Sequence, residues 1–61
     1  MYYIIEVDGI FRTPIAKSGR PERYEEPRYF KTLKDAKKWV ERHTYKGMSW
    51  KYEIVRLEEC T

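Results

Sequence analysis

The chain has 61 residues, of which 38% are charged, and its formal net charge is only +3. Such a length allows one domain at most, over residues 1–61, with a thin hydrophobic core. The single cysteine, Cys60, excludes a disulfide within the chain, and one His with one Cys cannot complete a tetrahedral zinc site. Because the sequence contains neither a transmembrane-length apolar run nor the pattern of a signal peptide, we expect a cytoplasmic protein without a membrane partner.

The first predicted elements form a β-hairpin. Residues 2–7 are rich in aromatic and β-branched side chains and are followed by Asp8-Gly9, a strong hairpin signal because both residues tolerate positive φ. The predicted return strand covers residues 10–13. Both faces of the first strand are largely apolar, which predicts a central position in the sheet.

A long loop is predicted over residues 14–27, where Pro and Gly dipeptides interrupt the strand pattern. Loops of this length in small domains are either mobile and solvated or functional, and both interpretations stay open. Three residues of the loop are candidates for contacting a partner: Arg20, Arg23 and Tyr24.

One helix is predicted over residues 32–43. Thr32 is a suitable N-cap and Asp35 follows at the third helical position, which is an acidic variant of the capping box. The apolar side chains recur with helical spacing, which predicts that one stripe of the helix faces the core. This stripe comprises Leu33, Ala36, Val40 and His43, with Trp39 beside it.

The polar side of the helix carries a row of like charges, Lys34, Lys38 and Arg42, at intervals of four residues. Such a row destabilises an isolated helix slightly. It is either ordinary soluble surface or a docking face for acidic groups.

A short strand is predicted at residues 28–31 and a longer one at residues 50–57, where alternation places Tyr52 and Ile54 toward the core. The order of elements is therefore β-β-α-β. This order predicts a small α+β fold, in which one helix packs on one face of an antiparallel-rich sheet of three to four strands.

The sequence favours a protein that is not an enzyme and needs no cofactor. His43 is the only histidine, and its place at the edge of the apolar stripe favours a packing role at the helix end. The clustered glutamates are Glu22, Glu25 and Glu26 in the loop and Glu58 and Glu59 near the C-terminus, where no fixed carboxylate pair is expected. The three glycines fit neither a P-loop nor a dinucleotide-binding fingerprint.

Basic and aromatic residues are the strongest remaining signal, and they support two functions. Trp, Tyr and Arg are typical hot spots of protein interfaces, while aromatic platforms with cations suit single-stranded nucleic acid. A host protein is the first expected partner and nucleic acid is the alternative. Part of the aromatic content could instead fill the core. The candidate binding residues are Arg20, Arg23, Tyr24, Lys34, Lys38, Arg42, Trp50 and Arg56.

The segments 3–9, 30–36 and 52–55 together resemble small α+β proteins encoded by bacteriophages and other mobile elements. The second half is more loosely similar to the phage T7 inhibitor of bacterial RNA polymerase, in its helix start and its closing strand. The resemblance implies a non-catalytic protein that regulates or inhibits a host protein by binding it. The residues that carry the looser resemblance are Thr32, Leu33, Ala36, Tyr52, Glu53, Ile54 and Arg56.

A homodimer is a further expectation, because one helix cannot cover both faces of the sheet. If Tyr3 and Ile5 face the helix, Tyr2 and Ile4 are left on the other face, together with Val55 of the last strand. Two such faces could pair, or the loop could fold back and cover the face with Ile15 and Tyr24.

Overall fold

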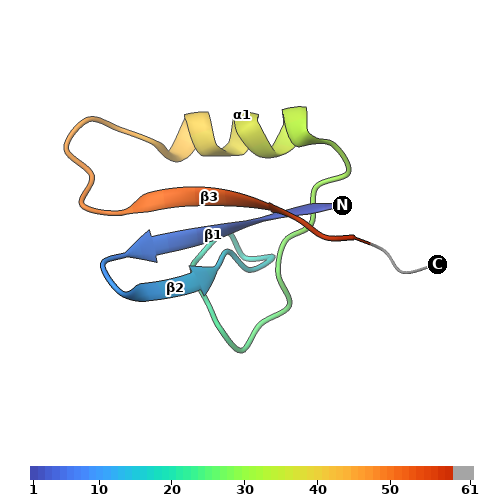
Figure 1. The fold of residues 1–61 in the computed structure, drawn as a ribbon, viewed down its shortest axis with the longest axis horizontal. Coiled ribbons are helices and arrows are strands. Elements are labelled where there is room, and N and C mark those ends of the chain that lie inside the picture. The colour runs from blue at the N-terminus through green and yellow to red at the C-terminus, as the bar shows by residue number, and fades with distance from the viewer. Residues whose placement is uncertain (59–61) are drawn as a thin grey trace.

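The computed structural model describes residues 1–58, so the predictions for Cys60 lie outside the described residues. It contains strands β1 (Tyr2–Asp8) and β2 (Phe11–Pro14), helix α1 (Leu33–His43) and strand β3 (Lys51–Arg56) (Figure 1). The three strands form an antiparallel sheet in the order β2-β1-β3, with the first strand at its centre as predicted. The predicted α+β fold, with its strand-strand-helix-strand order, is confirmed.

The β1–β2 hairpin turns one residue later than the sequence suggested. Asp8 pairs with Phe11 inside the ladder, so the two turn residues are Gly9 and Ile10. Only Gly9 has positive φ, at 61°, as expected of a type II′ turn, whose first central residue is glycine. Pro14 belongs to β2 and is tolerated there because β2 is an edge strand.

The pairing of β1 with β3 decides which side of the sheet faces the helix. Ile4 lies opposite Ile54, and both belong to the hydrophobic cluster formed with α1. Ile4 is completely buried, whereas Ile5 is only half-buried. The inward orientation predicted for Tyr52 and Ile54 is therefore confirmed, but the alternative that Tyr3 and Ile5 face the helix is wrong.

Helix α1 is closed at both ends by side chains. The backbone N–H of Asp35 donates to Thr32 Oγ1 over 3.2 Å, so Thr32 is the N-cap as predicted. At the C-terminal end, Thr44 Oγ1 donates to the carbonyl of Val40 over 2.6 Å. Ala36 and Trp39 are the buried helical residues, whereas Leu33 is 40% exposed and lines a surface depression with the helix lysines, so its predicted place in the core is wrong.

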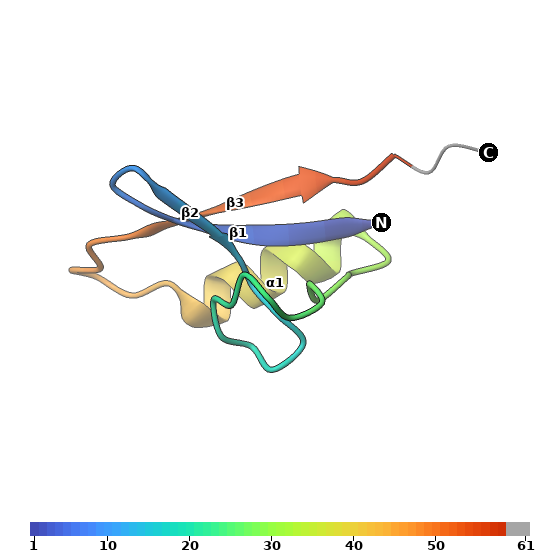
Figure 2. The same cartoon turned by 90° about the horizontal axis from the view of Figure 1, so that it is seen from below.

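The loop of residues 14–27 contributes to the core instead of covering the free face of the sheet. Figure 2 shows this loop and α1 on the same side of the sheet. Ile15 is 1% exposed and belongs to the cluster of Ile4 and Trp39, whereas Tyr24 is 93% exposed. Bridges from Ile15 to Pro21 and from Ala16 to Pro27 fold the loop on itself. The alternative in which Ile15 and Tyr24 cover the second face is therefore wrong.

Residues 28–31 form a single bridge where a short strand was predicted. Phe30 and Tyr2 exchange two backbone hydrogen bonds of 2.8 Å, but the ladder does not continue. The bridge puts Phe30 beside β1 just before α1 begins, and β3 pairs with the other edge of β1. The helix therefore connects two segments that lie on either side of the central strand.

The first prediction tests which face of β1 is buried. Replacing Ile4 by Val removes one methyl group from the closed core and should lower the free energy of unfolding by roughly 0.5–1.5 kcal/mol. The matched change Ile10→Val, at a hairpin-tip residue that is 90% exposed, should cost almost nothing. Urea denaturation measures both. An Ile5→Val variant that loses more stability than Ile4→Val would contradict the register.

Candidate functional site

The sequence-predicted binding residues do not converge on one site. They occupy the 14–27 loop, the outward side of α1, and the two ends of β3. All except Trp50 are exposed. The loop positions are Arg20, Arg23 and Tyr24, and the helix positions are Lys34, Lys38 and Arg42. Trp50 comes directly before β3, and Arg56 is its last residue.

Charges of opposite sign lie close together in the 14–27 loop. The ammonium group of Lys17 lies 2.8 Å from a carboxylate oxygen of Glu26, and this hydrogen bond raises the pKa of Lys17 above its usual range. Ser18 Oγ donates to Glu25 over 3.1 Å. These contacts are exposed and contribute little stability. The two contacts connect the first and last parts of the loop, and the arginines between them are exposed to solvent.

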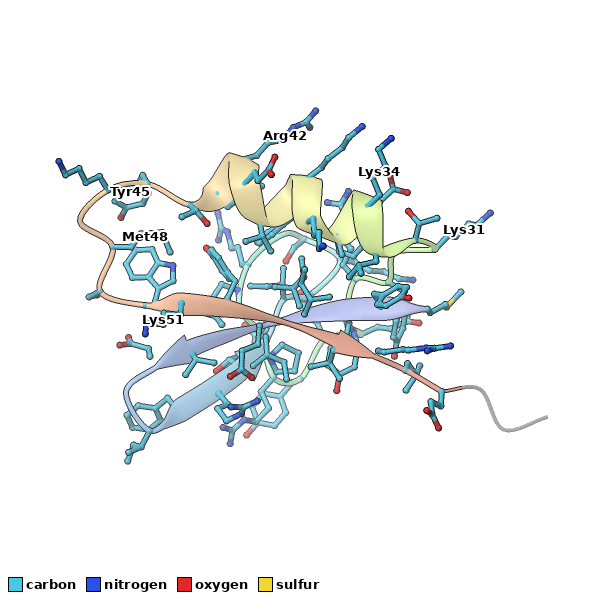
Figure 3. The ribbon with its side chains drawn as sticks, turned by 45° about the horizontal axis from the view of Figure 1, so that its top comes forward. Lys31, Lys34, Arg42, Tyr45, Met48 and Lys51 are labelled. Carbon is cyan, nitrogen blue, oxygen red and sulfur yellow. The ribbon has the colours of Figure 1, made fainter. Side chains whose placement is uncertain are left out.

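The basic row of α1 faces solvent. Lys34 and Arg42 project from the helix away from the sheet (Figure 3). Lys34, Lys37 and Lys38 surround an open depression of about 470 Å³ along this side of the helix. Leu33 supplies apolar surface there, and Glu41 is the one carboxylate in the lining. The helix thus presents a predominantly cationic face to solvent.

A smaller hollow of about 210 Å³ lies between α1 and the segment that leads into it. Its basic residues are Lys38 and Arg42 from the helix and Arg28 from the segment before it. The guanidinium of Arg28 lies 5.4 Å from the centre of the Phe30 ring, a cation–π contact. We call this site the cationic hollow, and its lining residues are Arg28, Phe30, Asp35, Lys38, Trp39 and Arg42.

Trp50 serves packing more than recognition. Its indole Nε1 donates to the Tyr52 hydroxyl over 3.1 Å, and its ring meets Tyr45 edge to face at 5.9 Å. Tyr52 in turn meets Trp39 at 5.2 Å. These aromatic rings add apolar contact area that the few aliphatic residues of a short chain cannot provide. Trp50 therefore packs against Tyr45 and Tyr52 outside the buried cluster, whereas Trp39 is the tryptophan that fills the core.

His43 packs at the end of the helix as predicted. Its ring stacks on Trp39 with a centroid distance of 3.8 Å and an interplanar angle of 13°. His43 Nδ1 lies 2.7 Å from the carbonyl oxygen of Trp39, one turn earlier in the helix. Both contacts fix the imidazole against the helix.

The second face of the sheet carries half-buried apolar residues and is covered by neither α1 nor the loop. The ladder puts Ile5 beside Pro14 and Glu53, and Tyr3 beside Val55. Tyr29 extends this surface through an edge-to-face contact with Tyr3 at 6.3 Å. We call this surface the open face, and its apolar residues are Tyr3, Ile5, Val7, Pro14, Tyr29 and Val55.

One ion pair crosses the open face. Arg12 of β2 and Glu53 of β3 bind each other through Nη2 and Oε2, although β1 lies between their strands. Arg12 is opposite Val7 and Glu53 is opposite Ile5, so the bridge passes over these two side chains. Both partners are about half exposed, so the pair adds little stability. Its main effect is to interrupt the apolar surface with charge.

Sequence reasoning missed the cationic hollow, whereas it expected an uncovered apolar face that includes Val55 but assigned the wrong residues of β1 to it. The cationic hollow depends on Arg28, which lies outside the helical row, and only the fold brings it beside Lys38. The open face depends on the pairing of β1 with β3. A partial signal existed for each: Arg28 belongs to a basic-aromatic stretch, and Val55 alternates with the inward Ile54.

Within residues 1–58, no three His, Cys, Asp or Glu side chains are grouped closely enough to hold a metal ion. Across the same residues, no helix has the length and apolarity needed to cross a membrane. Comparisons with protein-family models, with curated proteins and with solved structures found no match.

The second prediction concerns Glu6, which lies between Thr13 and Tyr52 on the helix side of β1. Burial raises the pKa of Glu6, and the nearby Asp8 raises it further, so its carboxylate is less favourable in the folded chain. This penalty is absent below the unfolded pKa and develops as pH rises through the folded pKa. Glu6→Gln should therefore match the wild type at acidic pH and be slightly more stable, by less than about 0.5 kcal/mol, at pH 7.

Thermal or urea unfolding of both proteins across pH 3–8 measures this difference. Glu22→Gln, at an exposed residue of the loop, is the matched control. An advantage of Glu6→Gln that is as large at low pH as at pH 7 would contradict the electrostatic cause.

Proposed function

We propose that this chain is a small, non-catalytic binding protein that acts on another protein through its open face. The observation that carries the proposal is the apolar surface of β1 and β3, which neither α1 nor the 14–27 loop covers. Contiguous exposed apolar surface on a small protein commonly marks an interaction site. The resemblance to phage and mobile-element proteins supports a regulator or inhibitor of a host protein.

The charges of the open face suggest the chemistry of the partner. Arg12 is paired with Glu53, whereas Lys51 on the same face has no ion-pair partner among residues 1–58. A complementary surface would be apolar at its centre and acidic where it meets Lys51. The aromatic residues Tyr3 and Tyr29 are of the type that carries much of the binding energy at interfaces.

A second copy of the chain fits the open face less well than a larger partner. Three strands about 4.8 Å apart and about six residues long present roughly 300 Å² of sheet, whereas stable complexes bury about 800 Å² per partner. Pairing two open faces would also bury the Arg12–Glu53 bridge of both copies, and the desolvation of these charges opposes association. A larger protein can extend its contacts beyond the sheet to Tyr29 and Leu57.

The third prediction tests the open face by capture from a bacterial lysate. The wild-type chain, immobilised through its C-terminus, should retain one stoichiometric protein. Val55→Lys places a charge among the apolar residues of the open face, beside Tyr3, and should abolish capture. Ile10→Lys makes the same kind of change at the exposed hairpin tip and should leave capture intact. Mass spectrometry and gel densitometry measure the retained protein.

Circular dichroism of both variants separates lost binding from lost folding. Equal capture by wild type and Val55→Lys, or recovery of nucleic acid alone, would contradict the proposal. Sedimentation of the purified wild type under reducing conditions tests the second copy. A dimer that Val55→Lys dissociates would assign the open face to self-association instead.

Nucleic-acid binding through α1 is a second candidate function, and the charge of the helix surface favours it. Lys34, Lys37 and Lys38 gather around one depression that contains the single carboxylate of Glu41. Arg42 continues the row toward the C-terminal end of the helix, and Lys34 and Arg42 point away from the sheet (Figure 3). A cationic helix face is the expected footprint of a phosphate backbone.

The fourth prediction concerns the salt dependence of this second function. A protein that binds a nucleic-acid backbone releases counterions, so its affinity should fall by orders of magnitude between about 50 and 200 mM salt. Fluorescence anisotropy with single- and double-stranded DNA and RNA measures the affinity. The double variant Lys34→Gln, Lys37→Gln should reduce the salt slope relative to wild type. Absence of binding at about 50 mM salt would exclude this function.

A further inference from the structure

We propose that the cationic hollow binds a phosphate group. Three cations from two parts of the chain line this space: Lys38 and Arg42 lie one turn apart on α1, and Arg28 belongs to the segment before the helix. Asp35 is the one carboxylate of the lining. The hollow is smaller than the roughly 300–1,000 Å³ of pockets for drug-sized ligands, so it suits a single anionic group.

The three cations are available to a ligand. All three residues are exposed, and neither ion pair found among residues 1–58 involves them. Those two pairs use Arg12 and Lys17 instead. Cations held near one another repel, and an anion placed between them relieves that repulsion. The hollow therefore carries a net positive charge that a bound anion would neutralise.

Arg28 is preorganised for this role. Its guanidinium lies over the ring of Phe30, which is 9% exposed and fixed by the bridge to Tyr2. A guanidinium held against an aromatic ring keeps the donors on its edge free for planar, bidentate bonds to phosphate oxygens. The ligand therefore meets an arginine whose conformational freedom is already reduced.

The aromatic residues of the hollow support the cations and leave little room for stacking a base. Trp39 is 7% exposed, and one face of its ring is covered by the stacked imidazole of His43. The ring of Phe30 is covered by Arg28. Recognition at this site is therefore expected to depend on charge and hydrogen bonds, not on stacking.

The cationic hollow is separate from the open face and does not depend on the proposed protein-binding function. It is lined by α1 and lies on the helix side of the sheet, whereas Val55 lies on the opposite side. A single molecule could therefore bind a protein on one side and a phosphate group on the other. Val55→Lys should leave phosphate binding unchanged, which keeps the two proposals separable.

The fifth prediction is tested by NMR titration with inorganic phosphate, at constant ionic strength against chloride. The amide signals of Lys38 and Arg42 should shift in a saturable manner. Arg28→Gln and Lys38→Gln should each weaken binding about tenfold, as expected for the loss of one charge-assisted hydrogen bond. Lys46→Gln makes the same charge change as Lys38→Gln at an exposed residue outside the hollow, and it should retain wild-type affinity.

Arg28→Gln could disturb the structure, because Arg28 packs on Phe30. Lys38→Gln does not carry this risk, because Lys38 is an exposed helical residue, so a loss of affinity in both variants cannot be due to misfolding. Shifts that fail to saturate, or an equal loss of affinity in Lys46→Gln, would overturn the proposal, because binding would then depend only on the overall positive charge. A short single-stranded DNA oligonucleotide identifies the source of the phosphate. Competition between the oligonucleotide and phosphate assigns the site to a nucleic-acid backbone, and phosphate binding alone assigns it to a free phosphate.

Discussion

The structure depends on the contact between Ile4 and the underside of helix α1. Ile4 lies on the central strand, is completely buried, and shares one cluster with Trp39 and Ala36. Because residues along a strand alternate between two faces, burial of Ile4 sends Tyr3 and Ile5 to the opposite side. One register between β1 and β3 therefore fixes the composition of the core and of the surface that is left uncovered.

Local signals predicted the elements well because their causes are local. Thr32 caps the helix through a contact three residues away, and Gly9 supplies the positive φ that the hairpin needs. The face of β1 was not predictable in this way, since Tyr2 and Ile4 are as apolar as Tyr3 and Ile5. Only pairing with Ile54, fifty residues away along the chain, distinguishes the two faces.

The candidate sites also combine features that follow from the local sequence with features that only the fold creates. The row of Lys34, Lys38 and Arg42 follows from helical periodicity alone, and the structure places these residues in solvent. The association of Lys38 with Arg28 requires the bridge that holds Phe30 against β1. Likewise, the role of the 14–27 loop follows from Ile15, whose burial on the helix side leaves the open face without a lid.

An uncovered apolar face favours unspecific association, and the charges on the open face reduce this tendency without abolishing it. The ion pair between Arg12 and Glu53 places two charges above Ile5 and Val7, where a second sheet would otherwise pack. Charged side chains on such a surface oppose indiscriminate pairing of sheets, because pairing would bury them. A specific partner can accommodate them, because both side chains are half exposed and their mutual attraction in water is weak. The same ion pair that discourages self-association therefore leaves the face open to a complementary protein.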